Sequence, residues 1–144
     1  TGELVFINAG HESILSSDQN KNYEYIKSEM PPIGIVKYFS ESMVKSNTIN
    51  IKDKTLVVYT DGVTEGYLEN GEELGAEGVQ NIINKISEVT PKSIVNSIEK
   101  ELNWGADKLR DDITCMAINI TNTDLIKKGK LKNTDKWLIL GLFT

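Results

Sequence analysis

Acidic residues follow a strongly apolar run near the middle of this 144-residue sequence. Residues 56–59 read LVVY, and Asp61, Gly62 and Glu65 come soon after them. An Asp-Gly pair is common in turns, so a turn is the simplest interpretation. The alternative is that the carboxylate of Asp61 binds a metal ion at the end of a strand, while Gly62 lets a ligand approach the backbone closely. This stretch alone is compatible with both interpretations.

Two other segments also join an apolar run to polar residues. Residues 8–11 read NAGH and residues 111–114 read DDIT. If neighbouring strands bring these segments to one rim of a sheet, their carboxylates repel one another unless a cation lies between them. Oxygen ligands suit Mg²⁺ or Mn²⁺ better than zinc or copper, and two such ions can activate a water for attack on phosphorus. Spacing alone makes this a hypothesis, because turns that contain aspartate occur in many domains.

The composition is typical of one soluble globular domain, with 39% hydrophobic and 26% charged residues. A net charge of −5 disfavours non-specific binding of nucleic acid, which needs clustered lysine and arginine. It is compatible with the binding of cations or of basic partner proteins. Cys115 is the single cysteine, so no internal disulfide can form, and its apolar surroundings predict a buried, unreactive thiol. His11 is the single histidine, which excludes a zinc site with several histidines within this chain.

The hydrophobic pattern predicts mainly strands in the first part of the chain. We expect them at residues 4–7, 13–16, 23–27, 42–51, 55–59 and 113–120. The run at 4–7 is apolar on both faces and should be covered on both sides. Residues 30–34 contain two prolines and a glycine and should interrupt regular structure, and residues 53–54 should form a turn.

Two amphipathic helices are expected between the last two strands. The first has apolar residues on one face, namely Val79, Ile82, Ile83, Ile86 and Val89. The second should begin with Thr90 as its N-cap and Pro91 in its first turn. Its apolar face should comprise Ile94, Val95, Ile98 and Leu102.

The two ends of the chain differ from its middle. The sequence opens with Thr1 and enters an apolar run within three residues, which favours a piece of a longer protein. No signal peptide and no apolar run of about 20 residues is present, so a cytoplasmic location is expected. Residues 121–136 are rich in lysine and residues 137–143 are apolar. We interpret this tail as a solvated linker and a short docking segment, or as the beginning of a membrane span, although seven residues cannot cross a bilayer.

Five motifs occur in the order NAGH, PPIGI, YTDGVTEG, ELGAEG and DDIT. This order resembles the metal-dependent serine/threonine protein phosphatases of the PPM type, and most of all their bacterial SpoIIE/RsbU-like branch. The resemblance runs from about residue 3 to residue 120. It implies an α+β fold, a partial PPM-phosphatase-like β-sandwich with flanking helices, and two Mn²⁺ or Mg²⁺ ions in the intact domain. Residues 1–120 would be the C-terminal part of such a phosphatase domain, followed by the tail at 121–144.

The resemblance also assigns roles to individual residues. Asp61 corresponds to the central metal-ligand aspartate of the family and Asp111 to the second one. Glu65 falls where some relatives place an acid for a weaker third metal, and Gly62 matches a glycine with a steric role. Judged alone, Glu65 would be a solvated acid.

Two further positions would support the metal ligands. Asp112 falls where many relatives have asparagine. His11 falls where some relatives have an aspartate, so a third metal is in doubt, and a lone histidine there could equally be a turn residue. Lys108 and Arg110 precede DDIT and could attract phosphate or simply be solvated.

One family feature is missing. The family also has an aspartate-glycine motif in its N-terminal half, which bridges both metals, and no residue ahead of Asn8 can supply it. The chain therefore resembles only the C-terminal half of the domain, and we expect it to be inactive alone.

The resemblance implies that the parent protein is a phosphoserine/phosphothreonine phosphatase. Its partner would be a phosphorylated regulator protein, a STAS-like anti-sigma antagonist. No nucleic acid or membrane is required, although the parent could be attached to a membrane sensor, and a dimer is left open. Two alternatives remain, a non-catalytic regulatory or interaction module with the same fold, and an unrelated hydrolase with a carboxylate metal site.

Overall fold

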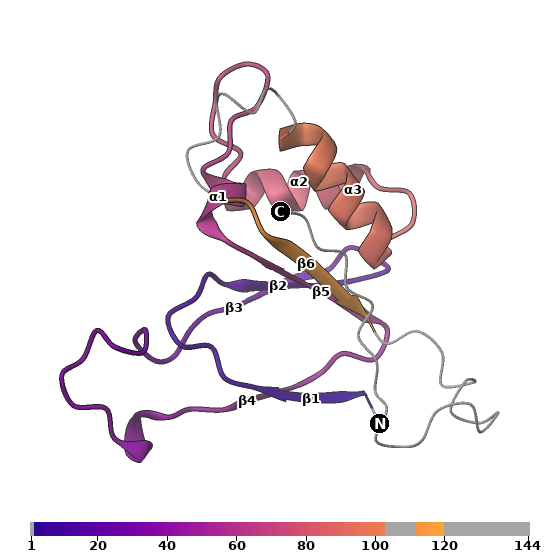
Figure 1. Cartoon of the computed structure of the whole chain (residues 1–144). Helices are drawn as coiled ribbons and strands as arrows, with labels where there is room; N and C mark the ends of the chain where they lie inside the picture. The colour runs from indigo at the N-terminus through magenta and orange to yellow at the C-terminus, as the bar shows by residue number, and fades with distance from the viewer. Residues whose placement is uncertain (1, 103–111, 120–144) are drawn as a thin grey trace.

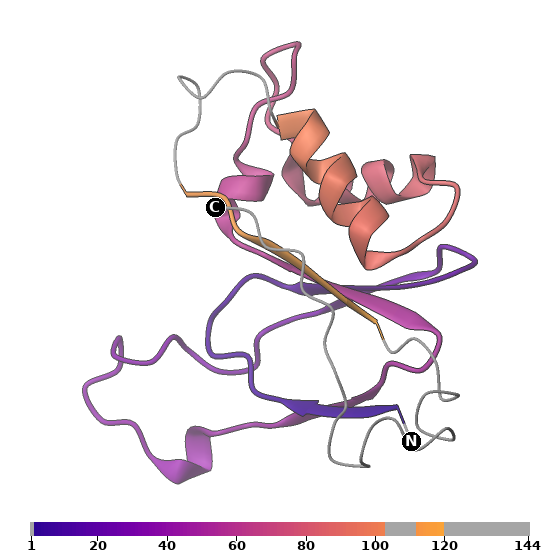
Figure 2. The ribbon, with the colours of Figure 1, turned by 45° about the vertical axis from the view of Figure 1, so that its right-hand side comes forward.

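The structure, a computed structural model, describes residues 2–102 and 112–119. Its elements form three layers (Figures 1 and 2). Two helices lie on one face of a four-stranded antiparallel sheet with the order β3-β2-β5-β6, and a two-stranded antiparallel sheet, β1-β4, lies beyond the other face. The strands are β1 (Glu3–Phe6), β2 (Ile14–Asp18), β3 (Tyr23–Ile26), β4 (Asn47–Asn50), β5 (Lys54–Tyr59) and β6 (Cys115–Asn119). The helices are α1 (Asp61–Thr64), α2 (Gly75–Lys85), α3 (Pro91–Leu102) and the 3₁₀ turn η1 (Glu41–Met43).

The four-stranded sheet has an apolar core on each face, because its central strands alternate. Leu15, Val57 and Ala117 are fully buried under α2 and α3. On the other face, Leu56 and Ile14 pack against the β1–β4 sheet. This arrangement of two packed sheets with helices outside one of them agrees with the predicted α+β sandwich.

Helix α3 begins as the sequence predicts. The backbone N–H of Ser93 donates to the Thr90 hydroxyl over 3.1 Å, which is an N-cap interaction, and Pro91 occupies the first helical position. The predicted apolar positions of this helix are all buried. Its apolar face therefore covers β6 and the centre of the sheet.

Helix α2 is shorter than its apolar periodicity indicates. The helix ends at Lys85, so Ile86 is its C-cap and Val89 lies in the connection to α3. Both side chains are nevertheless buried. The connection between α2 and α3 faces the same core as α2, so its buried apolar residues continue the spacing of the helix. The sequence pattern therefore predicted a longer helix than the structure contains.

The strand expected at 42–51 is wrong in its first half. Residues 41–43 form η1, and pairing with β1 begins only at Asn47, which lies opposite Phe6. The other predicted strands are present within a few residues. The predicted turn at 53–54 is also present, since Asp53 has a positive φ of 60° and the N–H of Lys54 donates to the carbonyl of Ile51.

The outer face of β1 is open in the described part of the chain. Val5 and Ile7 are 60% and 53% exposed, whereas Leu4 and Phe6 face the inner core. The expected cover on both faces is thus present on one face only. Among the described residues, no helix is both long enough and apolar enough to span a bilayer.

The predicted inert character of Cys115 agrees with the structure. The side chain is free of any disulfide and fully buried. Burial raises the pKa of the thiol to about 12, so the reactive thiolate is disfavoured at neutral pH.

Candidate metal site

The three polar segments meet at one end of the four-stranded sheet. Strand β5 runs antiparallel to both of its neighbours, with Leu15 opposite Val57 and Cys115 opposite Tyr59. Strands β2 and β6 therefore begin where β5 ends. The segments that precede β2 and β6 and the segment that follows β5 consequently share one rim, called the acidic rim below, as Figure 1 shows for α1 and the start of β6.

Thr60 joins two of these segments directly. Its hydroxyl donates to the carbonyl oxygen of Asp112 at 3.1 Å and accepts the backbone N–H of Thr114 at 3.0 Å. The backbone N–H of Thr60 also donates to the carbonyl of Thr114, at 3.0 Å. Thr60 therefore extends the pairing of β5 and β6, through its side chain and its backbone, into the TDG and DDIT motifs, and its partner Asp112 is 52 residues away in sequence.

Asp61 is the first residue of the one-turn helix α1, so the Asp-Gly pair does not form a simple β-turn. Its side chain is exposed, and its carboxylate accepts the N–H of Gly62 at 3.0 Å. A carboxylate offers about four lone-pair sites, so this bond leaves most of them open to a cation. Gly62 itself is buried.

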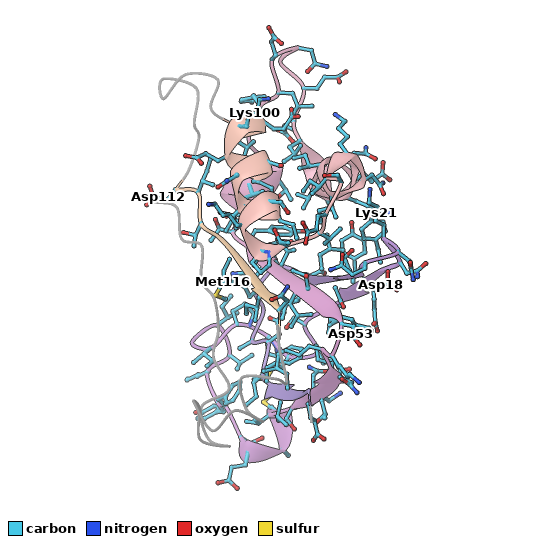
Figure 3. All side chains as sticks on the ribbon, turned by 90° about the vertical axis from the view of Figure 1, so that its right-hand side faces the viewer. Asp18, Lys21, Asp53, Lys100, Asp112 and Met116 are labelled. Carbon is cyan, nitrogen blue, oxygen red and sulfur yellow. The ribbon has the colours of Figure 1, made fainter. Side chains whose placement is uncertain are left out.

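Asp112 lies at the start of the β6 segment, on the outer edge of the molecule (Figure 3). Its side chain is exposed, and its backbone is held beside Thr60. Asp111 lies outside the described residues. The expectation that the carboxylates of Asp61 and Asp111 face each other therefore stays a prediction.

Glu65 lies one helical turn after Asp61. Its backbone N–H donates to the carbonyl of Asp61 at 2.8 Å, and its side chain is exposed. The next residue, Gly66, is buried, and a Cβ added there would lie 2.5 Å from a methyl of Leu102 and 3.1 Å from the carbonyl oxygen of Gly62. A side chain at position 66 would therefore displace Leu102 and crowd the carbonyl of Gly62, so glycine allows this segment to lie close to the end of α3.

The NAGH segment is organised by Asn8 more than by His11. The buried Asn8 side chain accepts the N–H of His11 at 2.9 Å and donates to the carbonyl of Glu12 at 3.1 Å. The His11 ring is exposed and has one described interaction, at 3.4 Å from the Glu12 carbonyl oxygen. Asn8 therefore forms a turn that places His11 at the surface, and the supporting role of His11 stays a prediction.

The donor set suits a hard divalent cation but is incomplete in the described part of the chain. The acidic rim offers carboxylate oxygens from Asp61, Glu65 and Asp112, which are the ligand type that Mg²⁺ and Mn²⁺ prefer. Among the described residues, however, no three His, Cys, Asp or Glu side chains lie close enough together to hold an ion. The oxygen chemistry therefore fits the predicted metals, and further ligands are needed to complete a site.

Residues 1–121 match the family described as Stage II sporulation protein E (SpoIIE), which is most of the chain. The chain belongs to the SpoIIE family. The fold and the family together identify it as part of a PPM-type (PP2C) phosphatase domain. No curated protein sequence matches this SpoIIE-family chain significantly.

Solved structures of PP2C domains share the fold of the SpoIIE-family chain. The SiaA-PP2C domain of Pseudomonas aeruginosa has a TM-score of 0.62 at 18% identity, with 83% of this chain and 47% of that one covered. The SpoIIE phosphatase domain of Bacillus subtilis, described as Mn presoaked, has a TM-score of 0.56 at 17% identity, with 83% and 56% covered. A Mycobacterium tuberculosis structure of RsbU and RsbW domains has a TM-score of 0.57 at 18% identity, with 81% and 32% covered. The chain thus spans about half the length of these structures, or less.

Sequence reasoning singled out the acids, whose metal-binding role stays a prediction, and missed the residues that position their segments. Thr60, Asn8 and Gly66 each fix a segment of the rim. The sequence feature that could have indicated these three residues is that they lie within the TDGVTEG and NAGH motifs. Their partners are distant in sequence or are backbone atoms, so spacing alone does not reveal them.

Proposed function

We propose that the complete protein carrying this SpoIIE-family chain is a Mn²⁺- or Mg²⁺-dependent phosphoserine/phosphothreonine phosphatase. The observation that supports the proposal most is the Thr60 contact, which brings the Asp61 segment and the DDIT segment to one rim. The oxygen-only acidic rim and the family support the same chemistry. Because the chain spans 47% of the SiaA domain and 56% of the B. subtilis SpoIIE domain, the activity is proposed for the complete protein.

When bound, two divalent ions would supply an activated water and neutralise charge on the phosphoryl oxygens. The residues of this chain would contribute ligands and their positions. Asp61 would hold metal with a carboxylate whose orientation is set by the N–H of Gly62. Thr60 would hold the backbone of residue 112, and hence the neighbouring acids of DDIT, at a fixed place relative to Asp61. Glu65, one turn away, would add negative charge at the periphery.

The proposed substrate is a phosphorylated regulator protein of the STAS-like anti-sigma antagonist type. The resemblance to the SpoIIE/RsbU-like branch motivates this choice. The exposed position of Asp61, Glu65 and Asp112 is consistent with it, because a phosphorylated side chain on the surface of a folded protein can reach an open rim.

The experiment compares two Asp-to-Asn variants of the complete gene product, one just beyond each end of β5. Asp61→Asn removes the carboxylate charge at the rim, while the amide oxygen can still accept the N–H of Gly62. Asp53→Asn is the matched control, because Asp53 is exposed at the opposite end of β5 and its φ of 60° suits asparagine. Figure 3 shows Asp53 and Asp112 far apart in the molecule.

We expect Asp61→Asn to lower Mn²⁺-dependent hydrolysis of p-nitrophenyl phosphate and of phosphoserine peptides by about 100-fold or more, since a lost ligand weakens metal binding and water activation. Asp53→Asn should match the wild type. Unchanged turnover in Asp61→Asn would contradict the assignment. A complete wild-type protein that releases no phosphate with Mn²⁺ or Mg²⁺ would instead favour the non-catalytic interaction module.

A further inference from the structure

Exposed apolar side chains gather in one loop of the chain. Eight large hydrophobic residues are exposed in the described part, and six of them lie within residues 33–44, called the apolar loop below. They are Ile33, Ile35, Tyr38, Phe39, Met43 and Val44. None of the six belongs to either apolar core. Exposed apolar side chains gathered in one segment commonly mark a binding surface.

The apolar loop has a fixed base at both of its ends. Before it, the buried Met30 forms a β-bridge with Ala9, and Pro32 lies so close to Gly10 that an added Cβ would clash with its ring. The hydroxyl of Ser28 reinforces this end, because it accepts the N–H of Gly10 at 2.7 Å. After the loop, β4 pairs with β1. The loop is therefore presented from a defined place on the molecule.

That place adjoins the acidic rim. Gly10 precedes His11 and Glu12, which lead into β2 at the end of the sheet where β5 finishes. Figures 1 and 2 both show the loop projecting on the same side of the molecule as α1 and the start of β2. A molecule large enough to cover the loop could thus also reach the rim.

The charge of the rim limits what can bind there. Glu12, Asp61, Glu65 and Asp112 are all exposed acids, and the chain carries a net charge of −5. A phosphorylated serine brings about −1.5 to −2 more charge, so the rim repels a phosphoprotein wherever metal does not compensate. Contacts beside the rim would therefore add attraction that does not depend on the bound metal. Binding energy from such remote contacts can also hold the reacting group in place.

We propose that the apolar loop is the docking surface for the phosphoprotein substrate of the acidic rim. Apolar side chains that flank the phosphorylated residue would pack on Ile35 and Tyr38, the most exposed side chains of the loop with Ile33, while the phosphoryl group reaches the rim. Lys37, which lies over the Tyr38 ring at 5.6 Å, would complement acidic groups of the partner. This inference rests on the proposed phosphatase function. It adds that the enzyme would select substrates with apolar residues beside the phosphorylated serine or threonine.

The test uses the complete gene product with Mn²⁺ and two phosphoserine peptides that differ only in having leucine or serine at the flanking positions. For the wild type we expect a KM about tenfold lower with the leucine peptide, because truncating a buried interface anchor commonly costs a factor of this order. The double variant Ile35→Ser/Tyr38→Ser should lose this preference and keep the wild-type rate with p-nitrophenyl phosphate, which is too small to reach the loop. Val5→Thr, an exposed apolar position on β1 outside the loop, should keep the preference.

Four results would overturn the proposal. They are a wild type without a preference between the peptides, a double variant that keeps the preference, a double variant with a lower unfolding midpoint, and a double variant that turns a dimeric wild type into a monomer. The third would mean that the loop packs inside the complete protein, and the fourth that a second copy covers it. Failure of the proposed function is recognised separately, as no hydrolysis of p-nitrophenyl phosphate by the wild type. In that case, fluorescence anisotropy with the labelled leucine peptide tests docking directly. The wild type should bind the peptide and the double variant should not, and equal binding by both would overturn the proposal.

Discussion

Thr60→Val is the most direct perturbation of the geometry that assembles the rim. Valine has nearly the shape of threonine and keeps the strand-end backbone, but it removes the hydroxyl that bonds to Asp112 and Thr114. The DDIT segment loses one hydrogen bond that it accepts and one that it donates. Thr60→Ser restores the hydroxyl without the methyl group and serves as the control.

The size of the effect follows from those two bonds. Each polar group left without a partner costs about 1–3 kcal/mol when buried, and Thr60 is only partly exposed, so we expect about 1–2 kcal/mol of lost stability for the chain. The backbone N–H of Thr60 still bonds to Thr114, which limits the displacement of β6. Metal affinity should fall more clearly, by about 10–100-fold, which is typical when a residue that orients metal ligands is removed.

The assay has two readouts on the complete gene product. Urea unfolding without metal gives the stability, and the Mn²⁺ dependence of p-nitrophenyl phosphate hydrolysis gives the apparent metal affinity. Thr60→Val should raise the Mn²⁺ concentration for half-maximal rate, while the rate at saturating Mn²⁺ changes less, and Thr60→Ser should recover most of the affinity. A Thr60→Val protein with lowered stability but wild-type Mn²⁺ dependence would refute the argument, because Thr60 would then be structural only.

Three other predictions follow from the described residues. Gly66→Ala should destabilise the chain by about 1–3 kcal/mol in urea unfolding, since its Cβ would meet Leu102 and backbone oxygens; combined with Leu102→Ala, the two changes should cost less than their sum. Stability should fall between about pH 9 and 12, because burial raises the folded-state pKa of both Cys115 and Tyr59 to about 12, so that only the unfolded chain loses these protons. Cys115→Ala should remove roughly 2 kcal/mol of that loss at pH 10.5, and identical pH profiles would contradict the buried thiol. Residues 1–144 alone should show no Mn²⁺-dependent phosphatase activity and should self-associate on size-exclusion chromatography, because Val5 and Ile7 leave an apolar face open; an active monomer would refute this.

Local signals predicted the elements whose ends are set by neighbouring residues. The start of α3 could be predicted because Thr90 and Pro91 act within one turn. The start of β4 could not, because residues 42–46 have a strand-like composition but no partner strand beside them. A strand needs a partner, and only the fold shows that pairing with β1 begins at Asn47.

The same distinction explains what the sequence revealed of the site. Asp61, Glu65 and Asp112 could be singled out because they lie in motifs that occur in the order of a known family, although acids in turns are common. Their position in space depends on Thr60, Asn8 and Gly66, whose polar contacts or close packing reach across the fold. The spacing of residues along the chain does not predict such contacts.

The structure therefore divides the acidic rim into two groups with different physical roles. The acids are exposed, so their removal should change chemistry and leave folding largely intact. Asn8 and Gly66 are buried and Thr60 is hydrogen-bonded across the sheet, so their removal should disturb folding and ligand position together. The contacts of this supporting group, and the core behind it, hold the segments that carry the acids at one end of the sheet. None of these contacts uses an acid side chain, so the position of the segments does not depend on the acids themselves.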